Sequence, residues 1–589
     1  GEKQGEFYGA VFQDSDVAKW LEAVAYTLAE KPDKELKKLA DSVIELIGRA
    51  QEPDGYFNTY FILKEPGQRF RNLREGHELY TLGHMIEAAV AYKRATGEKR
   101  FLEIVQKMAD LVANTFGVEE GKRMGMPGHQ EIELALMKLY EETGKESYKE
   151  LAKYFIDVRG CGNRNYFLEE MKQKDVKRIF PELNDYRPEY SQSHLPVRKQ
   201  RTAEGHAVRA VYMYAAMADI AAEYDDEELL GACETLWNNM VHRRMYVTGG
   251  IGSSGILERF TADYDLPNDY NYCESCASIG LAFFARRMMQ ITKKAKYVEV
   301  MERALYNTVL AGIAMDGKSF FYVNPLEVWP PSCMERTSKE HVKSVRQKWF
   351  GVACCPANIS RTLASLGEYI YACEKDTIYV NLFIGNETQI TVGEQKVHLS
   401  LETDFPWKNQ LKINVSGVKE SVQLAVRIPE YAQDYKIFCE GREQFYKEKD
   451  GYAYITCEKN GRYEVQFVSE PRFVRANPKV RADEGKVCVM WGPLVYTVEE
   501  TDNGENLQAL YIDTAKPVKK SEKEEFPMLI AAGKRICESG WGEEELYGSH
   551  PLEFAETEIT LVPYAYWGNR ENGEMAVWLK EYLSDRNNK

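Results

Sequence analysis

Side chains that bind metal ions gather in two segments of this sequence. Thiolate, imidazole and carboxylate groups are the usual zinc ligands in proteins, and four of them surround the ion as a tetrahedron. The candidates here are Cys273, Glu274, Cys276, Cys354 and Cys355. A lone Cys-x-x-Cys is a modest signal, and adjacent cysteines are not a standard zinc spacing because their side chains diverge. On spacing alone, a structural zinc, a group of buried thiols and a catalytic metal centre all stay open.

Three histidines occupy equivalent positions in a repeated pattern. Gly76-His77, Gly128-His129 and Gly205-His206 each precede a small, apolar helical segment. A single histidine at a helix start is usually a cap or a packed surface group. Three at matching positions indicate a shared pocket about as readily as shared packing, because repeats also share packing residues. A glycine-rich loop from Thr248 is expected to carry Glu258 to the same rim.

Several common enzyme motifs are absent from the sequence. There is no Gly-x-Ser-x-Gly elbow and no phosphate-binding P-loop. The zinc-protease motif His-Glu-x-x-His is absent too, since Thr81 follows His77-Glu-Leu-Tyr. The glycine-rich loop lies in a helical context, which is wrong for a dinucleotide fingerprint.

The composition indicates a globular chain and leaves neutral substrates open. A length of 589 residues exceeds what one hydrophobic core serves, so we expect two or more domains. The net charge of −15 argues against nucleic-acid binding and gives no reason to expect an anionic membrane as partner. No apolar run is long enough to span a bilayer. The polar first six residues lack a signal-peptide core, so we expect a cytoplasmic protein. The 12 cysteines favour free thiols and a metal site over a disulfide framework.

Helical periodicity dominates the first 370 residues. Apolar residues recur at helical spacing over 16–28 and 34–50. The first two Gly-His segments end at Thr96-Gly97 and Thr143-Gly144, and a more polar helix follows each of them. Such alternating inner and outer helices commonly close into an α/α toroid, in which the inner helices begin at one rim. This arrangement would direct the three imidazoles into one pocket.

Short strands replace helices after Tyr371, so we predict a mainly α and then β architecture. Alternating apolar segments bounded by turn residues occur at 377–383, 397–403, 422–428, 452–457, 463–468 and 487–498, and indicate a β-sandwich. The charged stretch Glu499 to Glu525 suggests a further boundary before strands at 558–563 and 575–579. We predict a catalytic domain over 1–370, a β-sandwich over 371–478 and a second, smaller one over 479–589.

Motifs spread over nearly the whole chain resemble the β-L-arabinofuranosidases of glycoside hydrolase family 127. They are Phe12-Gln-Asp-Ser-Asp-Val, His77-Glu-Leu-Tyr, Gly128-His-Gln-Glu-Ile-Glu-Leu-Ala, Asp263-Tyr-Asp-Leu-Pro-Asn-Asp, Glu274-Ser-Cys276-Ala-Ser, Cys354-Cys355-Pro-Ala-Asn, Trp491-Gly-Pro-Leu-Val-Tyr and Leu561-Val-Pro-Tyr-Ala-Tyr-Trp-Gly-Asn-Arg. Motifs in the right order are far more specific together than any one of them alone.

The resemblance implies an (α/α)6 toroid followed by two β-sandwich domains, and a zinc ion (Zn²⁺) as cofactor. It implies Cys354 as nucleophile and Glu258 as general acid/base. It assigns the metal to Glu274, Cys276, Cys354 and Cys355, and the sugar to His77, His129, His206, Tyr322 and Glu274. Cys273 lies just before the Glu-x-Cys motif, where no ligand is expected.

The implied reaction is retaining, exo-acting hydrolysis of β-linked L-arabinofuranose from oligosaccharides or glycoconjugates. Zinc would deprotonate the coordinating thiol, and a desolvated pocket would raise the pKa of Glu258 so that it starts protonated. The alternatives are a sister enzyme acting on another furanoside or an arabinan, a sugar-binding toroid with structural zinc, and a toroid epimerase or lyase. The loop-like region 159–198 would set the subsites of a sister enzyme. A homodimer stays open.

Overall fold

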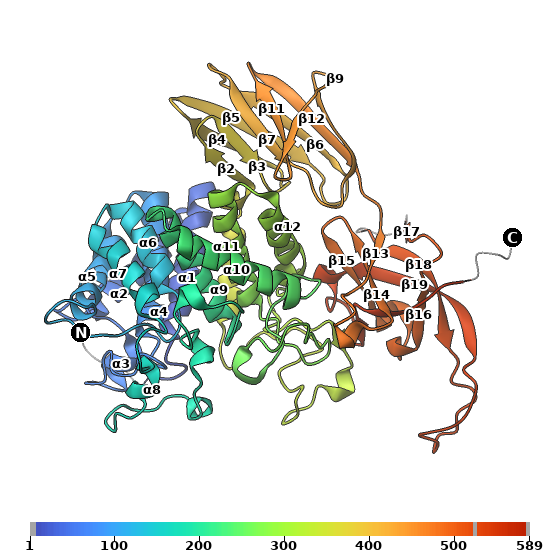
Figure 1. Cartoon of the computed structure of the whole chain (residues 1–589), viewed down its shortest axis with the longest axis horizontal. Coiled ribbons are helices and arrows are strands. Elements are labelled where there is room, and N and C mark those ends of the chain that lie inside the picture. Colours follow the sequence, from blue (N-terminus) through green and yellow to red (C-terminus); the bar gives the residue numbers. More distant parts are fainter. Residues whose placement is uncertain (1–6, 522–526, 585–589) are drawn as a thin grey trace.

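A helical part comes first in the chain, and two strand-rich parts follow it (Figure 1). The structure is a computed structural model and describes residues 7–521 and 527–584. The predicted order of helices and then strands is confirmed. None of the helices among these residues is long and apolar enough to cross a membrane.

Twelve helices of the first part form an inner and an outer layer. The elements that build these layers are α1 (Asp14–Glu30), α2 (Lys34–Ala50), α4 (Glu78–Thr96), α5 (Arg100–Thr115), α6 (Ile132–Thr143), α7 (Glu146–Val158), α9 (Ala207–Glu223), α10 (Glu227–Arg243), α11 (Ser275–Thr292), α12 (Ala295–Ala304), α13 (Cys354–Ala364) and α14 (Gly367–Ile370). The helices predicted at 16–28 and 34–50 are present as α1 and α2.

Six of these helices contact one another in sequence around a closed path. Helix α1 packs on α4, α4 on α6, α6 on α9, α9 on α11 and α11 on α13, and α13 packs back on α1. The other helices lie outside: α5 covers α4, α7 covers α6, α10 covers α9 and α12 covers α11. The inner helices α4, α9 and α11 are buried along most of their length, as expected for helices that are apolar on all sides.

The predicted helix ends agree with the structure, but the repeat is not regular at every start. Gly97 and Gly144 end α4 and α6 in the left-handed conformation, with φ of 78° and 69°. His77 and His206 directly precede α4 and α9. Helix α6 instead begins three residues after His129, so its histidine lies on the approach to the helix and not at its cap.

The second part consists of two sheets that share one core. One sheet has the order β10-β11-β7-β3-β2 and the other β4-β5-β6-β12-β8-β9. Apolar side chains of both sheets contribute to the same buried cluster. The strands are β2 (Tyr371–Glu374), β3 (Thr377–Val380), β4 (Asn386–Val392), β5 (Gln395–Thr403), β6 (Gln410–Ser416), β7 (Val422–Arg427), β8 (Gln433–Cys439), β9 (Arg442–Glu443), β10 (Lys447–Lys449), β11 (Tyr452–Cys457) and β12 (Gly461–Val468).

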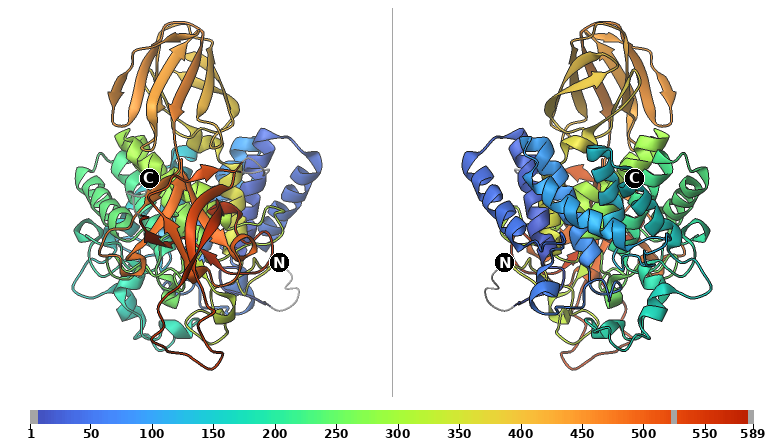
Figure 2. Two further views of the ribbon diagram at one scale, coloured as in Figure 1. Left: turned by 90° about the vertical axis from the view of Figure 1, so that its right-hand side faces the viewer. Right: turned by 90° about the vertical axis from the view of Figure 1, so that its left-hand side faces the viewer.

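The third part is built on one continuous sheet in the order β1-β20-β15-β19-β18-β16-β21-β14-β13, with β17 paired to β18. Its strands are β1 (Glu327–Val328), β13 (Arg472–Val474), β14 (Lys486–Trp491), β15 (Leu494–Glu499), β16 (Leu510–Asp513), β17 (Lys519–Lys520), β18 (Leu529–Ile536), β19 (Phe554–Pro563), β20 (Met575–Ala576) and β21 (Leu579–Tyr582). Figure 2 shows this part against the side of the helices, whereas the second part stands on one end of them.

In the third part, the structure contradicts one predicted boundary and divides one predicted strand segment into two strands. The stretch from Glu499 to Glu525 is no boundary, because β15 on one side pairs with β19 and β20, and β16 within it pairs with β18 and β21. Residues 522–525 of that stretch lie outside the described part. The segment 487–498 forms two paired strands, β14 and β15, because Gly492-Pro493 turns the chain between them.

The third part also supports a segment of the helical part. Strand β1 comes from the helical part and pairs with β20. The Tyr564 hydroxyl donates to the carbonyl of Pro325 at 2.8 Å, and the amide of Asn307 donates to the carbonyl of Pro493 at 3.0 Å. The third part therefore fixes the segment that carries Tyr322.

Candidate active site

A cavity of about 230 Å³ lies where the inner helices begin. The predicted residues from separate segments line it together: His77, His129, His206, Glu258, Glu274, Cys276, Tyr322 and Cys354. Glu274 precedes α11, and Cys354 is the first residue of α13. Helix N-termini carry partial positive charge, so this end of the helices favours anions.

Three sulfurs and one carboxylate form a compact, buried group beside the cavity. The Cys276 Sγ lies 3.6 Å from the Cys354 Sγ and 3.6 Å from the Cys355 Sγ, and the latter two are 3.9 Å apart. The Glu274 Oε1 is 3.3 Å from the Cys354 Sγ and 3.7 Å from the Cys355 Sγ. The four ligand atoms lie within 4.8 Å of one another, so the group can hold a metal ion.

The thiols do not all ionise by themselves. Burial raises the pKa of Cys276, but its hydrogen bonds with Cys354 and Cys355 lower it to about 6. The hydrogen bond with Cys276 raises the pKa of Cys354 above 9, and burial raises that of Cys355 well above 9. At neutral pH the nucleophile candidate Cys354 therefore keeps its proton unless a cation joins the group.

Tyr322 also contacts the sulfur of Cys354. Its hydroxyl lies 2.9 Å from the Cys354 Sγ. The backbone positions it, because Val323 pairs with Glu274 and the Ser275 amide donates to the Tyr322 carbonyl at 3.3 Å. Tyr322 and the Glu-x-Cys motif are thus held as one unit.

Glu258 lines the same cavity and is hydrogen-bonded to two side chains. The His206 Nε2 lies 2.7 Å from Glu258 Oε2, and the Tyr272 hydroxyl donates to Glu258 Oε1 at 2.9 Å. Burial raises the pKa of Glu258, but the hydrogen bond and charge of His206 outweigh burial and bring the pKa below 4.5. Desolvation acts in the expected direction, but two donors stabilise the carboxylate, so the expectation that Glu258 starts protonated was wrong for this structure.

The three histidines form a row of buried rings. Their ring centroids are 5.6 Å apart between His77 and His129, and 5.5 Å apart between His129 and His206. Burial lowers the pKa of His77 to about 3 and that of His129 well below 6.5. The Nδ1 of His77 lies 2.6 Å from the Glu75 carbonyl, and that of His129 lies 2.9 Å from the Gln130 carbonyl. Both Nδ1 atoms therefore carry the hydrogen, and each Nε2 is left as an acceptor.

The glycine before each histidine permits close backbone contact. A Cβ on Gly128 would lie 2.3 Å from the Arg74 carbonyl oxygen. A Cβ on Gly205 would lie 1.9 Å from the Glu189 carbonyl oxygen, and the φ of Gly205 is +70°. The Gly-His pattern therefore reflects how tightly one segment must pass another to direct an imidazole into the cavity.

Unusual backbone conformations occur at the site itself. His77, Leu257, Glu258 and Cys273 have φ values of 54°, 59°, 52° and 45°. Non-glycine residues in this region cost of order 1 kcal/mol or more, and such residues cluster at functional sites. The left-handed pair Leu257-Glu258 directs the carboxylate back toward His206.

Cys273 lies apart from the sulfur group. It is fully buried in a different apolar cluster, against Gly250, and burial raises the pKa of its thiol above 9. It takes no part in the four-ligand group. Its thiol is a packing group.

Sequence reasoning missed several residues of the site. Tyr80, Tyr212 and Arg209 also line the cavity, and Tyr272 donates to Glu258. Lys19 is fully buried behind Tyr80. Tyr80 lies in the quoted motif His77-Glu-Leu-Tyr, one helical turn after His77, and that spacing was a usable signal.

Family models match three consecutive segments of the chain. They are the catalytic domain of glycoside hydrolase family 127, described as a β-L-arabinofuranosidase (residues 2–368), its middle domain (377–469) and its C-terminal domain (471–580).

Solved and curated proteins are similar over nearly the whole chain. The chain is 40% identical to a non-reducing end β-L-arabinofuranosidase of Bifidobacterium longum subsp. longum, covering 98% of this chain and 90% of that protein. It is 48% identical to a crystal structure of a family 127 β-L-arabinofuranosidase from Geobacillus stearothermophilus T6, with a TM-score of 0.95 and coverage of 99% and 92%. A family 127 β-arabinofuranosidase structure is 35% identical, with a TM-score of 0.87 and coverage of 99% and 90%.

Proposed function

The chain belongs to glycoside hydrolase family 127, and we propose that it releases β-linked L-arabinofuranose from the non-reducing ends of oligosaccharides or glycoconjugates with retention of configuration. The observation that carries this proposal is that Cys354 and Glu258 line one cavity. Such an arrangement provides a nucleophile below an anomeric carbon and an acid beside the leaving oxygen.

The geometry of the sulfur group supports zinc as the ion. A tetrahedral zinc with Zn–S bonds of about 2.3 Å separates its sulfurs by about 3.8 Å. The three sulfur separations of 3.6, 3.6 and 3.9 Å match this edge length. Thiolates and a carboxylate also suit zinc better than the harder magnesium or calcium. When bound, zinc supplies the positive charge that deprotonates the coordinating thiols.

Metal analysis of the purified protein is expected to find about one zinc per chain, since one four-ligand site is present. Cys276→Ser is expected to lower that content at least about tenfold, because a serine hydroxyl is a poor zinc ligand. Cys273→Ser is the matched control and should retain the zinc. Equal zinc in Cys276→Ser and the wild type would contradict the ligand assignment.

The proposed reaction has two displacements. In the first, the Cys354 Sγ bonds to the anomeric carbon, the glycosidic C–O bond breaks, and Glu258 gives its proton to the departing oxygen. In the second, the Glu258 carboxylate takes a proton from water, the water oxygen bonds to the anomeric carbon, and the C–S bond breaks. Two inversions at one carbon give overall retention.

Binding of the sugar would prepare Glu258 for the first step. In the empty pocket the His206 Nε2 stabilises the Glu258 carboxylate. A furanose hydroxyl that takes the His206 hydrogen bond removes this stabilisation while the sugar also excludes water. Both changes raise the pKa of Glu258 and favour the protonated form that the first step needs.

His206→Asn is expected to move the basic limb of the pH profile of kcat/KM to higher pH. The variant keeps a group near the Nδ1 position but loses the Nε2 donor, so the carboxylate loses stabilisation and its pKa rises. Because the active form is protonated, a higher pKa keeps the acid competent to higher pH. A limb that stays in place or moves to lower pH would show that His206 does not control Glu258.

The proposed function is tested with chromogenic substrates. The wild type is expected to hydrolyse an aryl β-L-arabinofuranoside and to leave the α-anomer intact, and NMR should show the β-product forming first. Equal rates on both anomers, or initial formation of the inverted sugar, would refute the proposal.

Finer features of the architecture and substrate remain part of the proposal. The closed path of inner helices supports an (α/α)6 toroid, and the shared core supports a β-sandwich after it. We propose domains over 1–370, 371–478 and 479–589. The pairing of β13 with β14 favours a second boundary near residue 471.

Within the region 159–198, Phe180, Leu183 and Tyr190 line the cavity, so this region would distinguish arabinosides from other furanosides or arabinans. The cytoplasmic location and a homodimer stay predictions.

A further inference from the structure

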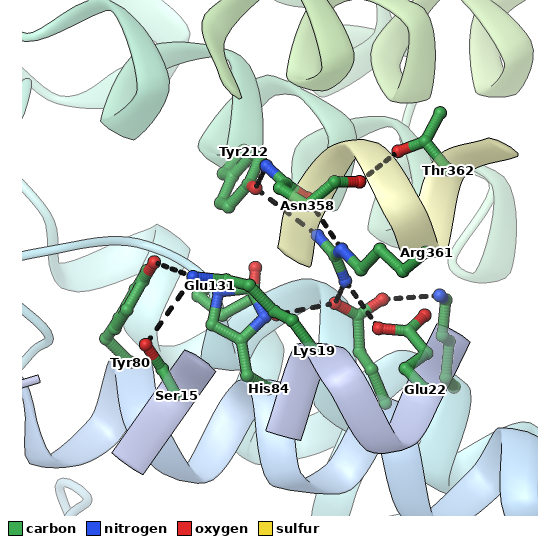
Figure 3. A network of polar contacts seen from close by, with 12 residues as sticks. Ser15, Lys19, Glu22, Tyr80, His84, Glu131, Tyr212, Asn358, Arg361 and Thr362 are labelled. Atoms are coloured by element: carbon green, nitrogen blue, oxygen red, sulfur yellow. Dashed lines mark hydrogen bonds and ion pairs between the residues drawn. The ribbon is translucent and has the colours of Figure 1, made fainter. Parts of the chain in front are cut away.

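A buried polar network fills the space between the inner helices behind the cavity (Figure 3). It includes three basic and three acidic side chains: Lys19, Lys138, Arg361, Glu22, Glu87 and Glu131. His84, Glu87 and Glu131 are close enough to hold a metal ion. However, Lys138 and Arg361 already donate to Glu87, so these cations neutralise the carboxylate that a metal would need.

The network reaches the cavity through two tyrosines. Tyr80 of α4 and Tyr212 of α9 both line the cavity. The Lys19 Nζ donates to the Tyr80 hydroxyl oxygen at 3.1 Å. The Asn358 Nδ2 and the Arg361 Nη2 donate to the Tyr212 hydroxyl oxygen at 3.0 and 3.3 Å. Each tyrosine oxygen therefore accepts from a group behind it, as Figure 3 shows.

This arrangement leaves each hydroxyl hydrogen to donate elsewhere. A tyrosine hydroxyl has one hydrogen, and burial holds the pKa of Tyr80 and Tyr212 well above 10, so both keep it. Within the described part of the chain, neither hydroxyl donates to a protein acceptor. A donor behind each oxygen also polarises the O–H bond and strengthens it as a donor.

The histidines beside these tyrosines have the complementary character. The Nε2 atoms of His77 and His129 are acceptors, and the His129 ring lies 4.4 Å from the Tyr80 ring between centroids. A sugar hydroxyl donates one hydrogen bond and accepts others. A hydroxyl that reaches both groups can donate to a histidine nitrogen and accept from a tyrosine.

We propose that Tyr80 and Tyr212 are substrate-binding donors that bond to oxygens of the furanose, and that Lys19 is the positioning residue that fixes the Tyr80 hydroxyl for this purpose. The inference rests on the proposed function, since it needs a sugar in the cavity. It assigns a binding role to two members of a network whose other members lie on α1, α4, α6 and α13.

Tyr80→Phe and Tyr212→Phe test the donor role, since each removes one hydroxyl and keeps the ring. Each is expected to lower kcat/KM on an aryl β-L-arabinofuranoside about three- to tenfold, the range for one hydrogen bond. The loss should appear mainly as a higher KM, because such a bond exists in both the ground and transition states. Tyr214→Phe is the matched control on α9, because its hydroxyl is buried without a hydrogen-bond partner among the described residues and Tyr214 does not line the cavity.

Lys19→Met, alone and with Tyr80→Phe, tests the positioning role. If Lys19 acts through Tyr80, adding Lys19→Met to Tyr80→Phe costs little further kcat/KM, although Lys19→Met alone costs about as much as Tyr80→Phe. Additive losses of kcat/KM would refute the positioning role. The donor role would be refuted if Tyr80→Phe and Tyr212→Phe had the same kcat/KM as the control Tyr214→Phe. A wild type with no activity on the substrate would instead refute the proposed function. Should Lys19→Met fail to fold, the tyrosine variants alone decide the donor claim.

Discussion

Cys354→Ser is expected to lower kcat/KM on an aryl β-L-arabinofuranoside at least about 10³-fold, the loss expected when a covalent nucleophile is removed. Serine keeps the shape of the side chain, so the cavity and the contact with Tyr322 should survive. A hydroxyl is much harder to ionise than a thiol and binds zinc poorly, so the variant lacks the anion that must attack the anomeric carbon.

The control for this prediction is Cys273→Ser, the same chemical change at a buried cysteine outside the sulfur group. It is expected to keep its kcat/KM within about a factor of two, as for a packing thiol. Equal activity of Cys354→Ser and Cys273→Ser would exclude sulfur as the nucleophile. Circular dichroism of both variants, with equal melting temperatures, would show that the fold is not the cause.

Glu258→Gln is expected to lower kcat/KM about 10²- to 10⁴-fold on a substrate with a sugar leaving group, the usual contribution of general acid–base catalysis. The amide can still bond to His206 and Tyr272, but it cannot give a proton to the leaving oxygen. A nitrophenolate leaves without a proton, so the first step should suffer much less on a nitrophenyl substrate. The second step should stay slow, because no base activates the water.

The two substrates thus separate the roles of Glu258. A loss that is the same for sugar and nitrophenyl leaving groups in single-turnover experiments would show that Glu258 binds substrate but does not act as the acid. A burst of nitrophenol followed by a slow steady state is the expected pattern.

Much of the fold follows from local sequence patterns. Helices at 34–50 and at the segments ending in Thr96-Gly97 and Thr143-Gly144 have clear periodicity and clear end signals, and the structure has them with these ends. The boundary at 499–525 was wrong, because charge and loop content describe a segment but not its pairing partners. Strand β15 pairs with strands more than sixty residues later, and no local pattern shows that.

The candidate site residues could be named from the sequence, but their electrostatics could not. The Gly-His pattern and the cysteine spacing left several interpretations open, the family resemblance named the candidates, and eight of these residues line one cavity. The pKa of Glu258 depends on the hydrogen bond between His206 and Glu258, which are far apart in the sequence, and spacing carries no information about it. The same holds for Lys19 and Tyr80, whose contact joins α1 to α4.

The most direct test of the central claim is to identify the atom that carries the sugar during the reaction. Glu258→Gln mixed with a nitrophenyl β-L-arabinofuranoside, quenched in acid and digested, should accumulate a covalent intermediate that mass spectrometry can locate. The account predicts a single pentosyl group on the Cys354 sulfur, in the peptide that begins α13. A pentosyl ester on Glu274, or no adduct during a measurable burst, would contradict it.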